Sequence, residues 1–191
     1  MTAILGHLGS ATTAANSVAQ VCRNLATVVA FGVANSAAVM IGKVIGEGNK
    51  ERAKEYGKRF IKLTIITSIA GSIVILCVRP VVLSVLTLSD DARKLLSVML
   101  LIMAYYVIAQ AYNTTLIVGV FRGGGDTRFG FFLDVTFMWG ISIVLGFIAA
   151  FILELPAIIV AFILYFDEII KIPFSTWRYK SYKWLNDVTR K

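Results

Sequence analysis

Five long apolar runs constrain the fold of this chain most strongly. About 20 apolar residues in a helix are enough to cross the hydrocarbon core of a bilayer. Five segments meet or nearly meet that length: Val18–Ile45, Phe60–Val78, Leu95–Val120, Phe129–Leu153 and Pro156–Pro173. Because lipid offers the backbone no hydrogen-bond partners, each run has to pair its own N–H and C=O groups as a helix. The sequence therefore predicts an all-α integral membrane protein.

The composition and charge agree with a lipid environment. The chain has 191 residues, of which 58% are hydrophobic and 16% charged, and its mean hydropathy is +0.78. These values are far from those of soluble domains. The net charge of +8 does not indicate nucleic acid, because the basic residues lie in short connections and the tail rather than on one soluble face. We expect them to contact anionic lipid headgroups instead.

The positions of Lys and Arg predict the orientation in the membrane. Fifteen of the 19 lie in the connection after the first run, in the connection 121–128, or at the end of the last run and the tail 174–191. The opposite side holds only Arg79, Arg93 and Lys94. The positive-inside rule then places the C-terminus in the cytoplasm and the N-terminus outside, in the plasma (inner) membrane. Residues 1–12 lack the basic region of a cleavable signal.

The connection GEGNKERAKEYGKRF, residues 46–60, predicts a short cytoplasmic helix of its own. Asn49 can cap its N-terminus, and Glu55 can pair with Arg59 one turn later.

Polar side chains form one arc on the helix predicted over 18–45 and the residues just before it. At 100° per residue the arc consists of Asn16, Gln20, Arg23, Asn24, Thr27 and Asn35. Lipid does not accept such an arc, so it faces either polar partners on another helix or a water-filled cavity. Arg23 favours the cavity, although an arginine near a helix end can also extend to the headgroups. Small residues at every fourth position, from Cys22 to Gly46, predict a ridge for close helix packing.

The helix predicted over 95–120 carries a second distinctive face. Its members are Met99, Met103, Tyr106, Gln110 and Asn113. Thioethers beside an aromatic ring and two amides make an adaptable surface that suits bulky amphipathic ligands. Methionine and aromatic stripes also occur in ordinary packing, so both interpretations stay open.

The stretch VFRGGGDTRFGFF, residues 120–132, looks at first like a phosphate-binding loop. It contains neither GxxxxGK[ST] nor GxGxxG. Gly123, Gly124 and Gly125 can end one helix with at least one positive φ, Asp126 can cap the next, and Arg122 suits a helix C-terminus. We therefore predict a tight helix hairpin with a structural role.

Four pieces of the chain together resemble the C-terminal half of a multidrug and toxic compound extrusion (MATE) transporter. They are MIGKVIGEGNKERAKEYGKR, FRGGGDTRF, FLDVTFMWGISIVLGFI and YFDEIIKIPFSTWRYKSYKW. The likeness covers essentially the whole chain, and its most specific piece is the Arg-Gly-Gly-Gly-Asp-Thr turn after the family's tenth helix. The resemblance implies twelve helices in two six-helix lobes around a central cleft. Residues 1–191 would then be a C-lobe with five complete helices, and Met1–Gly9 would be the outer loop after a missing seventh helix.

This resemblance also implies a function. MATE transporters export cationic or amphipathic compounds by alternating access and use an inward Na⁺ or H⁺ gradient, with no cofactor beyond that ion. The chain would thus be half of a secondary antiporter whose partners are the bilayer, small substrates and a missing N-terminal half.

The residue that couples transport to the ion gradient is not expected on the tenth helix. In some branches an acidic residue on the tenth helix helps to bind the cation, but Leu95–Val120 contains none. Asp134 has no basic residue at i±3 or i±4, so we predict an unpartnered carboxylate that couples a cation or a proton. Asp167 and Glu168 precede Lys171 by one turn and predict a structural ion-pair cluster.

Other classes fit less well. His7 is the only histidine, neither HExxH nor GxSxG occurs, and Cys22 and Cys77 lack the spacing of metal ligands, which disfavours an enzyme. A lipid-linked saccharide flippase of related fold would need a basic cavity, for which Arg23 is the one candidate. A truncated, non-transporting membrane subunit is the alternative outside transport.

Overall fold

The structure is a computed structural model that describes residues 2–186, and within that range every regular element is helical. The helices α1 (Thr2–His7), α2 (Ser10–Gly46) and α3 (Lys50–Val85) are followed by α4 (Asp90–Thr114), which continues as a π-helical stretch, η1 (Thr115–Phe121). A second continuous rod consists of α5 (Thr127–Val135), η2 (Thr136–Ile143), α6 (Val144–Phe147) and η3 (Ile148–Ile152). Two shorter helices close the chain, α7 (Ala157–Leu164) and α8 (Asp167–Lys180).

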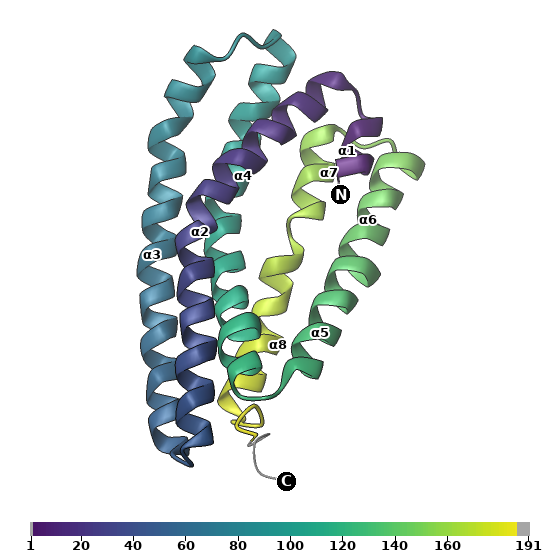
Figure 1. The fold of residues 1–191 in the computed structure, drawn as a ribbon. Coiled ribbons are helices and arrows are strands. Elements are labelled where there is room, and N and C mark those ends of the chain that lie inside the picture. Colours follow the sequence, from purple (N-terminus) through teal and green to yellow (C-terminus); the bar gives the residue numbers. More distant parts are fainter. Residues whose placement is uncertain (1, 187–191) are drawn as a thin grey trace.

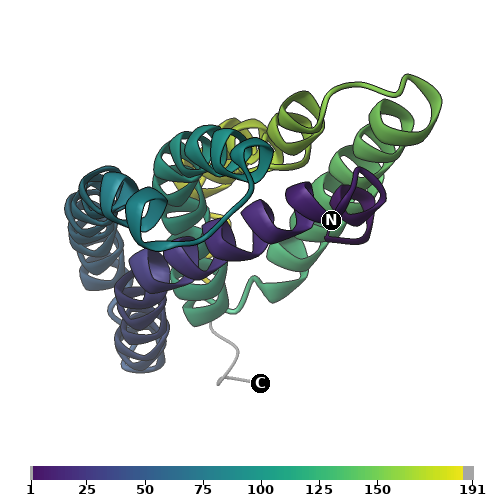
Figure 2. The same ribbon diagram turned by 90° about the horizontal axis from the view of Figure 1, so that it is seen from above.

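The long helices run up and down side by side (Figures 1 and 2). α2, α3 and α4 pack against one another, and α7 and α8 pack on α4 and lie between it and the rod α5–η3. One hydrophobic core surrounds α4 with parts of α1, α2 and α7, and a second joins η1 to α2, α5 and the residues after α8. α4 is the central helix, since over half of its most apolar window is buried inside the protein.

The small-residue ridge on α2 packs as its sequence predicts. Added Cβ atoms at Gly71 of α3 and Gly119 of η1 would lie 2.9 Å from the Ala26 carbonyl oxygen and 3.0 Å from that of Ala34. Only glycine allows the backbones to approach so closely.

Within residues 2–186, four helices are long and apolar enough to cross a membrane: Ser10–Gly46, Lys50–Val85, Asp90–Phe121 and Thr127–Ile152. The predicted helix 156–173 is instead divided at Tyr165 and Phe166 into α7 and α8, so the fifth helix is not continuous. The predicted separate helix 46–60 was also wrong, because α3 runs without a break from Lys50. No proline separates residues 46–60 from the apolar run that follows them, so the helix continues. Gly57, which could weaken the helix, packs against the Tyr179 ring. Residues 2–7, expected in a loop, form α1.

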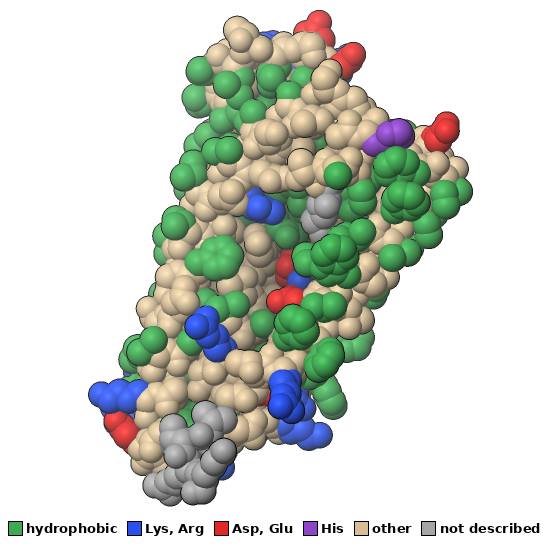
Figure 3. Space-filling model, turned by 45° about the vertical axis from the view of Figure 1, so that its right-hand side comes forward, with side chains coloured by type: hydrophobic (Ala, Val, Ile, Leu, Met, Phe, Trp, Pro, Cys, Tyr) green, Lys and Arg blue, Asp and Glu red, His purple; other side chains and the backbone are tan. Residues whose placement is uncertain are grey.

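The two ends of the bundle differ in charge (Figure 3). We call the end with the connections 47–49 and 122–126 and the last turn of α8 the basic end, because the Lys and Arg side chains gather there. The connections 86–89 and 153–156 lie at the opposite end (Figure 1). Arg190 and Lys191, counted in the sequence analysis, are outside the described residues.

Candidate functional site

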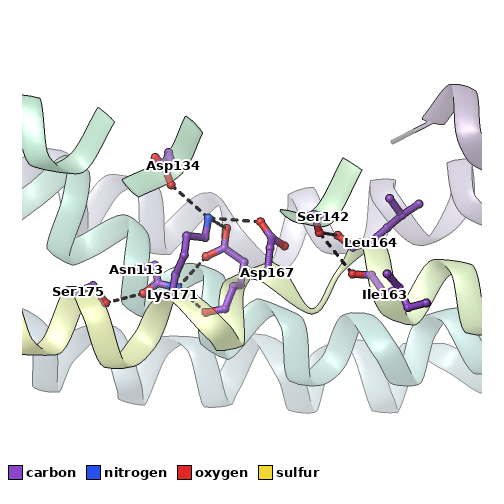
Figure 4. A network of polar contacts seen from close by, with 9 residues as sticks. Asn113, Asp134, Ser142, Ile163, Leu164, Asp167, Lys171 and Ser175 are labelled. Atoms are coloured by element: carbon purple, nitrogen blue, oxygen red, sulfur yellow. Dashed lines mark hydrogen bonds and ion pairs between the residues drawn. The ribbon is translucent and has the colours of Figure 1, made fainter. Parts of the chain in front are cut away.

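A buried lysine and its carboxylates lie where α8 begins. The chain breaks at Tyr165 and Phe166, and the first residues of α8 carry Asp167, Glu168 and, one turn later, Lys171 on one face. The Lys171 side chain is 4% exposed. Its Nζ lies 2.7 Å from Glu168 Oε1 and 3.4 Å from Asp167 Oδ2 (Figure 4). The ion pairs predicted within this segment are present.

Two other helices complete this site, which we call the Lys171 cluster. Asp134 of α5 places Oδ1 3.1 Å from Lys171 Nζ. Asn113 of α4 donates from Nδ2 to the Glu168 carbonyl oxygen at 2.7 Å and to Glu168 Oε2 at 2.8 Å. Ser175 donates to Asn113 Oδ1 at 2.9 Å and fixes the orientation of that amide. Three carboxylates therefore share one ammonium, and the cluster joins α4, α5 and α8 (Figure 4).

The prediction that Asp134 lacks a basic partner was wrong. Lys171 of α8 is that partner, and it lies 37 residues further along the chain. Local spacing cannot reveal such a pair, because only tertiary packing brings the two helices together. The Asp134 side chain is also 46% exposed, whereas Asp167 is 3% and Glu168 11% exposed.

The predicted polar arc on α2 divides into buried and open parts. Asn16 is buried and accepts a hydrogen bond from the Tyr165 hydroxyl at 2.8 Å. Thr27 is buried and donates back to the Arg23 carbonyl oxygen of its own helix. Gln20 and Arg23 are half-buried, and Asn24 and Asn35 are exposed. Arg23 donates to Asn24 Oδ1 at 2.9 Å.

The α4 face likewise has two parts. Met99 and Met103 are fully buried in the hydrophobic core, so the structure places them in packing and not on an open ligand surface. Tyr106 is buried with its ring edge-on to Tyr165, 5.1 Å between centroids, and the Arg23 guanidinium lies 5.9 Å above it. Gln110 is half-buried, and its Oε1 has no hydrogen-bond partner among the described residues. Tyr106 thus contacts the arc through Arg23, whereas Asn113 belongs to the Lys171 cluster.

The RGGGDT turn is a helix hairpin, as predicted, and Gly125 has the positive φ, +79°. Asp126 occupies the N-cap position but caps nothing with its side chain. Its Oδ2 instead accepts a hydrogen bond from Arg178 Nε at 2.7 Å, because the end of α8 packs beside the turn. The Asn186 N–H donates to the Gly124 carbonyl oxygen at 2.9 Å. The residues after α8 therefore hold the hairpin.

Figure 3 shows a hollow in one face of the protein, with acidic and basic side chains at its bottom. Ionised side chains inside a bundle of apolar helices are costly and mark ion or substrate pathways in membrane proteins. A family model described as MatE matches residues 1–148. This chain belongs to the MatE family. The resemblance predicted from the sequence is confirmed, and the protein is a multi-pass membrane protein of a transporter family.

Several curated proteins resemble parts of this MatE chain. It is 28% identical over 143 residues to a probable multidrug resistance protein NorM of Xanthomonas campestris pv. campestris. The aligned region covers 75% of this chain and 31% of that protein. It is 31% identical over 156 residues to an uncharacterized transporter of Schizosaccharomyces pombe, covering 81% of this chain and 26% of that protein. The chain thus spans about a quarter to a third of the length of these curated relatives. These relatives are named as transporters or resistance proteins and not as enzymes.

Solved structures share the fold. A MOP superfamily transporter from Pyrococcus furiosus, described as having a binding pocket of reverse polarity, superposes with a TM-score of 0.81 at 20% identity. An outward-facing multidrug resistance MATE family transporter gives 0.78 at 19% identity. Each covers 99% of this chain, which corresponds to 42% of the solved chain.

Proposed function

We propose that this chain acts as the C-terminal lobe, residues 1–191, of a secondary antiporter that exports cationic or amphipathic compounds. α7 and α8 together would form its fifth membrane crossing, broken at Tyr165 and Phe166. An opposing lobe would cover the hollow, and alternating access would expose it to either side of the membrane.

The observation that carries the proposal is the net charge of the Lys171 cluster. Three carboxylates and one ammonium leave two negative charges in excess when all are ionised. An uncompensated charge inside a bundle is unfavourable, so such a site takes up protons or cations. That chemistry suits coupling to an H⁺ or Na⁺ gradient, and the half-buried amides of Gln20 and Gln110 suit the polar part of an amphipathic substrate.

A flippase for lipid-linked saccharides is the second candidate. Arg23 supports it, since its guanidinium is half-buried over the Tyr106 ring and could bind an anionic headgroup.

Transport by the complete gene product in proteoliposomes distinguishes the two functions. We expect a cationic dye to accumulate when an H⁺ or Na⁺ gradient is imposed, and Arg23→Gln to change this accumulation little. Dye accumulation that is absent under both gradients, together with gradient-independent movement of an anionic lipid that Arg23→Gln abolishes, would favour the flippase.

A further inference from the structure

Lys171 Nζ occupies the point on which three carboxylates from two helices converge. Its distances to Glu168 Oε1, Asp134 Oδ1 and Asp167 Oδ2 are 2.7, 3.1 and 3.4 Å. The three carboxylates are arranged as in a cation-binding site, and the Lys171 ammonium occupies the position of the cation. Among the described residues, Asn113 of α4 is the other side chain that hydrogen-bonds to these carboxylates, and its amide carries no compensating positive charge. Arg23 of α2 lies over Tyr106 and donates to Asn24.

The three carboxylates are not equivalent. Asp167 and Glu168 share a helix with Lys171 and are buried, so they stay beside it whatever α5 does. Asp134 belongs to α5 and has a half-exposed side chain. An ion or a proton that enters from water therefore meets Asp134 first.

Asp167 gives an independent indication that the cluster binds something further. Its side chain is 3% exposed, and its Oδ1 has no hydrogen-bond partner among the described residues. Buried polar atoms are nearly always paired with protein or with a bound species. Lys171 alone therefore does not satisfy the carboxylates around it.

We propose that Lys171 is a tethered cation in a coupling centre, which holds Asp134 against α8 until a proton or a monovalent cation binds Asp134 in its place. When a proton from water converts Asp134 to the neutral acid, Lys171 remains charged and paired with Glu168 and Asp167. The net charge of the cluster then falls from two negative charges to one. This inference rests on the proposed transport function and adds the residues that couple the ion.

The release would be local. Among the described residues, two other hydrogen-bonded links join α7 and α8 to the α5–η3 rod and its N-cap residue, namely Arg178–Asp126 at the basic end and the Ser142 hydroxyl donating to the Leu164 carbonyl oxygen at 2.9 Å. Neither involves the Lys171 cluster. Binding at Asp134 therefore frees the C-terminal end of α5 from Lys171, while the links at Asp126 and Ser142, which precede and follow it in the chain, stay in place. The rod can then bend between these two links, toward or away from the hollow.

Infrared difference spectroscopy on the purified complete gene product tests this. Acidification should produce a carboxylic-acid band that Asp134→Asn removes. Asp126→Asn is the matched control, because Asp126 pairs with Arg178, which like Lys171 belongs to α8. This variant should keep the band. Adding NaCl, compared with choline chloride at fixed pH, reduces the band if Na⁺ competes for the site and leaves it unchanged if the proton alone binds.

Transport gives the second readout. Asp134→Asn should lower gradient-driven dye accumulation about tenfold while downhill exchange of the dye persists. In Asp126→Asn, gradient-driven accumulation should not fall relative to downhill exchange. An unchanged band in Asp134→Asn, or equal uncoupling by Asp126→Asn, overturns the inference. If Asp134→Asn does not fold, Asp134→Glu should shift the titration midpoint of the band, and an identical midpoint also overturns it. If the wild-type protein shows a band that Asp134→Asn removes but no gradient-driven transport, the proposed transport function is refuted and ion binding at Asp134 is retained.

Discussion

At the scale of single residues, Gly124 shows how tightly the RGGGDT hairpin and the C-terminal segment fit together. A Cβ at this position would lie 2.1 Å from the Trp184 carbonyl oxygen and 2.6 Å from its ring atom Cε3. Trp184 is fully buried and donates from Nε1 to the Tyr179 carbonyl oxygen at 3.0 Å, so it cannot give way easily. We expect Gly124→Ala to destabilise the protein by about 1–3 kcal/mol through overpacking. Thermal unfolding in detergent measures the change.

Gly32→Ala is the matched control for Gly124→Ala. Gly32 is inside α2, and apart from the neighbouring backbone of that helix no atom of the described residues lies within 4 Å of a Cβ there. Alanine at this position should therefore leave stability equal or raise it by about 0.5–1 kcal/mol. Equal melting temperatures for both variants would contradict the packing argument. The sequence predicted at least one positive φ among the three glycines, and Gly125 has it. It could not predict why Gly124 has to be glycine, because Trp184 lies 60 residues away.

At the scale of elements, the break between α7 and α8 depends on a contact that is distant in sequence. α7 ends at Leu164, and the last carbonyls of a helix lack partners within it. Ser142 of η2 supplies a donor, with its hydroxyl 2.9 Å from the Leu164 carbonyl oxygen. We expect Ser142→Ala to leave this buried oxygen unpaired, to cost about 1–3 kcal/mol and to speed hydrogen exchange at the backbone amides of residues 166–170. Exchange followed by mass spectrometry checks this.

Ser36→Ala controls for the loss of a hydroxyl. Ser36 is exposed and donates only to the Gly32 carbonyl oxygen of its own helix, so its removal should leave exchange near the break unchanged. Faster exchange in both variants would mean that Ser142 has no special role there. Hydropathy predicted the long helices, because lipid forces apolar runs to form helices. It could not predict the break, since the run 156–173 has no glycine and no proline between its ends.

At the scale of the whole molecule, the sequence predicted the family and the helical bundle but only part of the candidate site. The polar residues of α2 and α4 could be found by periodicity, because 100° per residue places them on common faces. Their burial could not, and Met99 and Met103 proved to be core residues. The link between Asp134 and Lys171 joins helices whose relative position only the tertiary structure reveals. A carboxylate in a membrane helix needs some partner, and the sequence could show that need at Asp134 but not which residue meets it.

The charge difference between the two ends of the bundle leads to a prediction about its orientation. Lys and Arg gather at the basic end, and an anionic inner leaflet attracts each of them by about 1 kcal/mol. The basic end should therefore lie in the cytoplasm. In a protein whose native Cys22 and Cys77 are replaced by alanine, Thr87→Cys should react with a membrane-impermeant thiol reagent in intact cells. Glu47→Cys, exposed at the basic end, should react only after the membrane is permeabilised. Labelling of Glu47→Cys in intact cells, with Thr87→Cys protected, would show the opposite orientation.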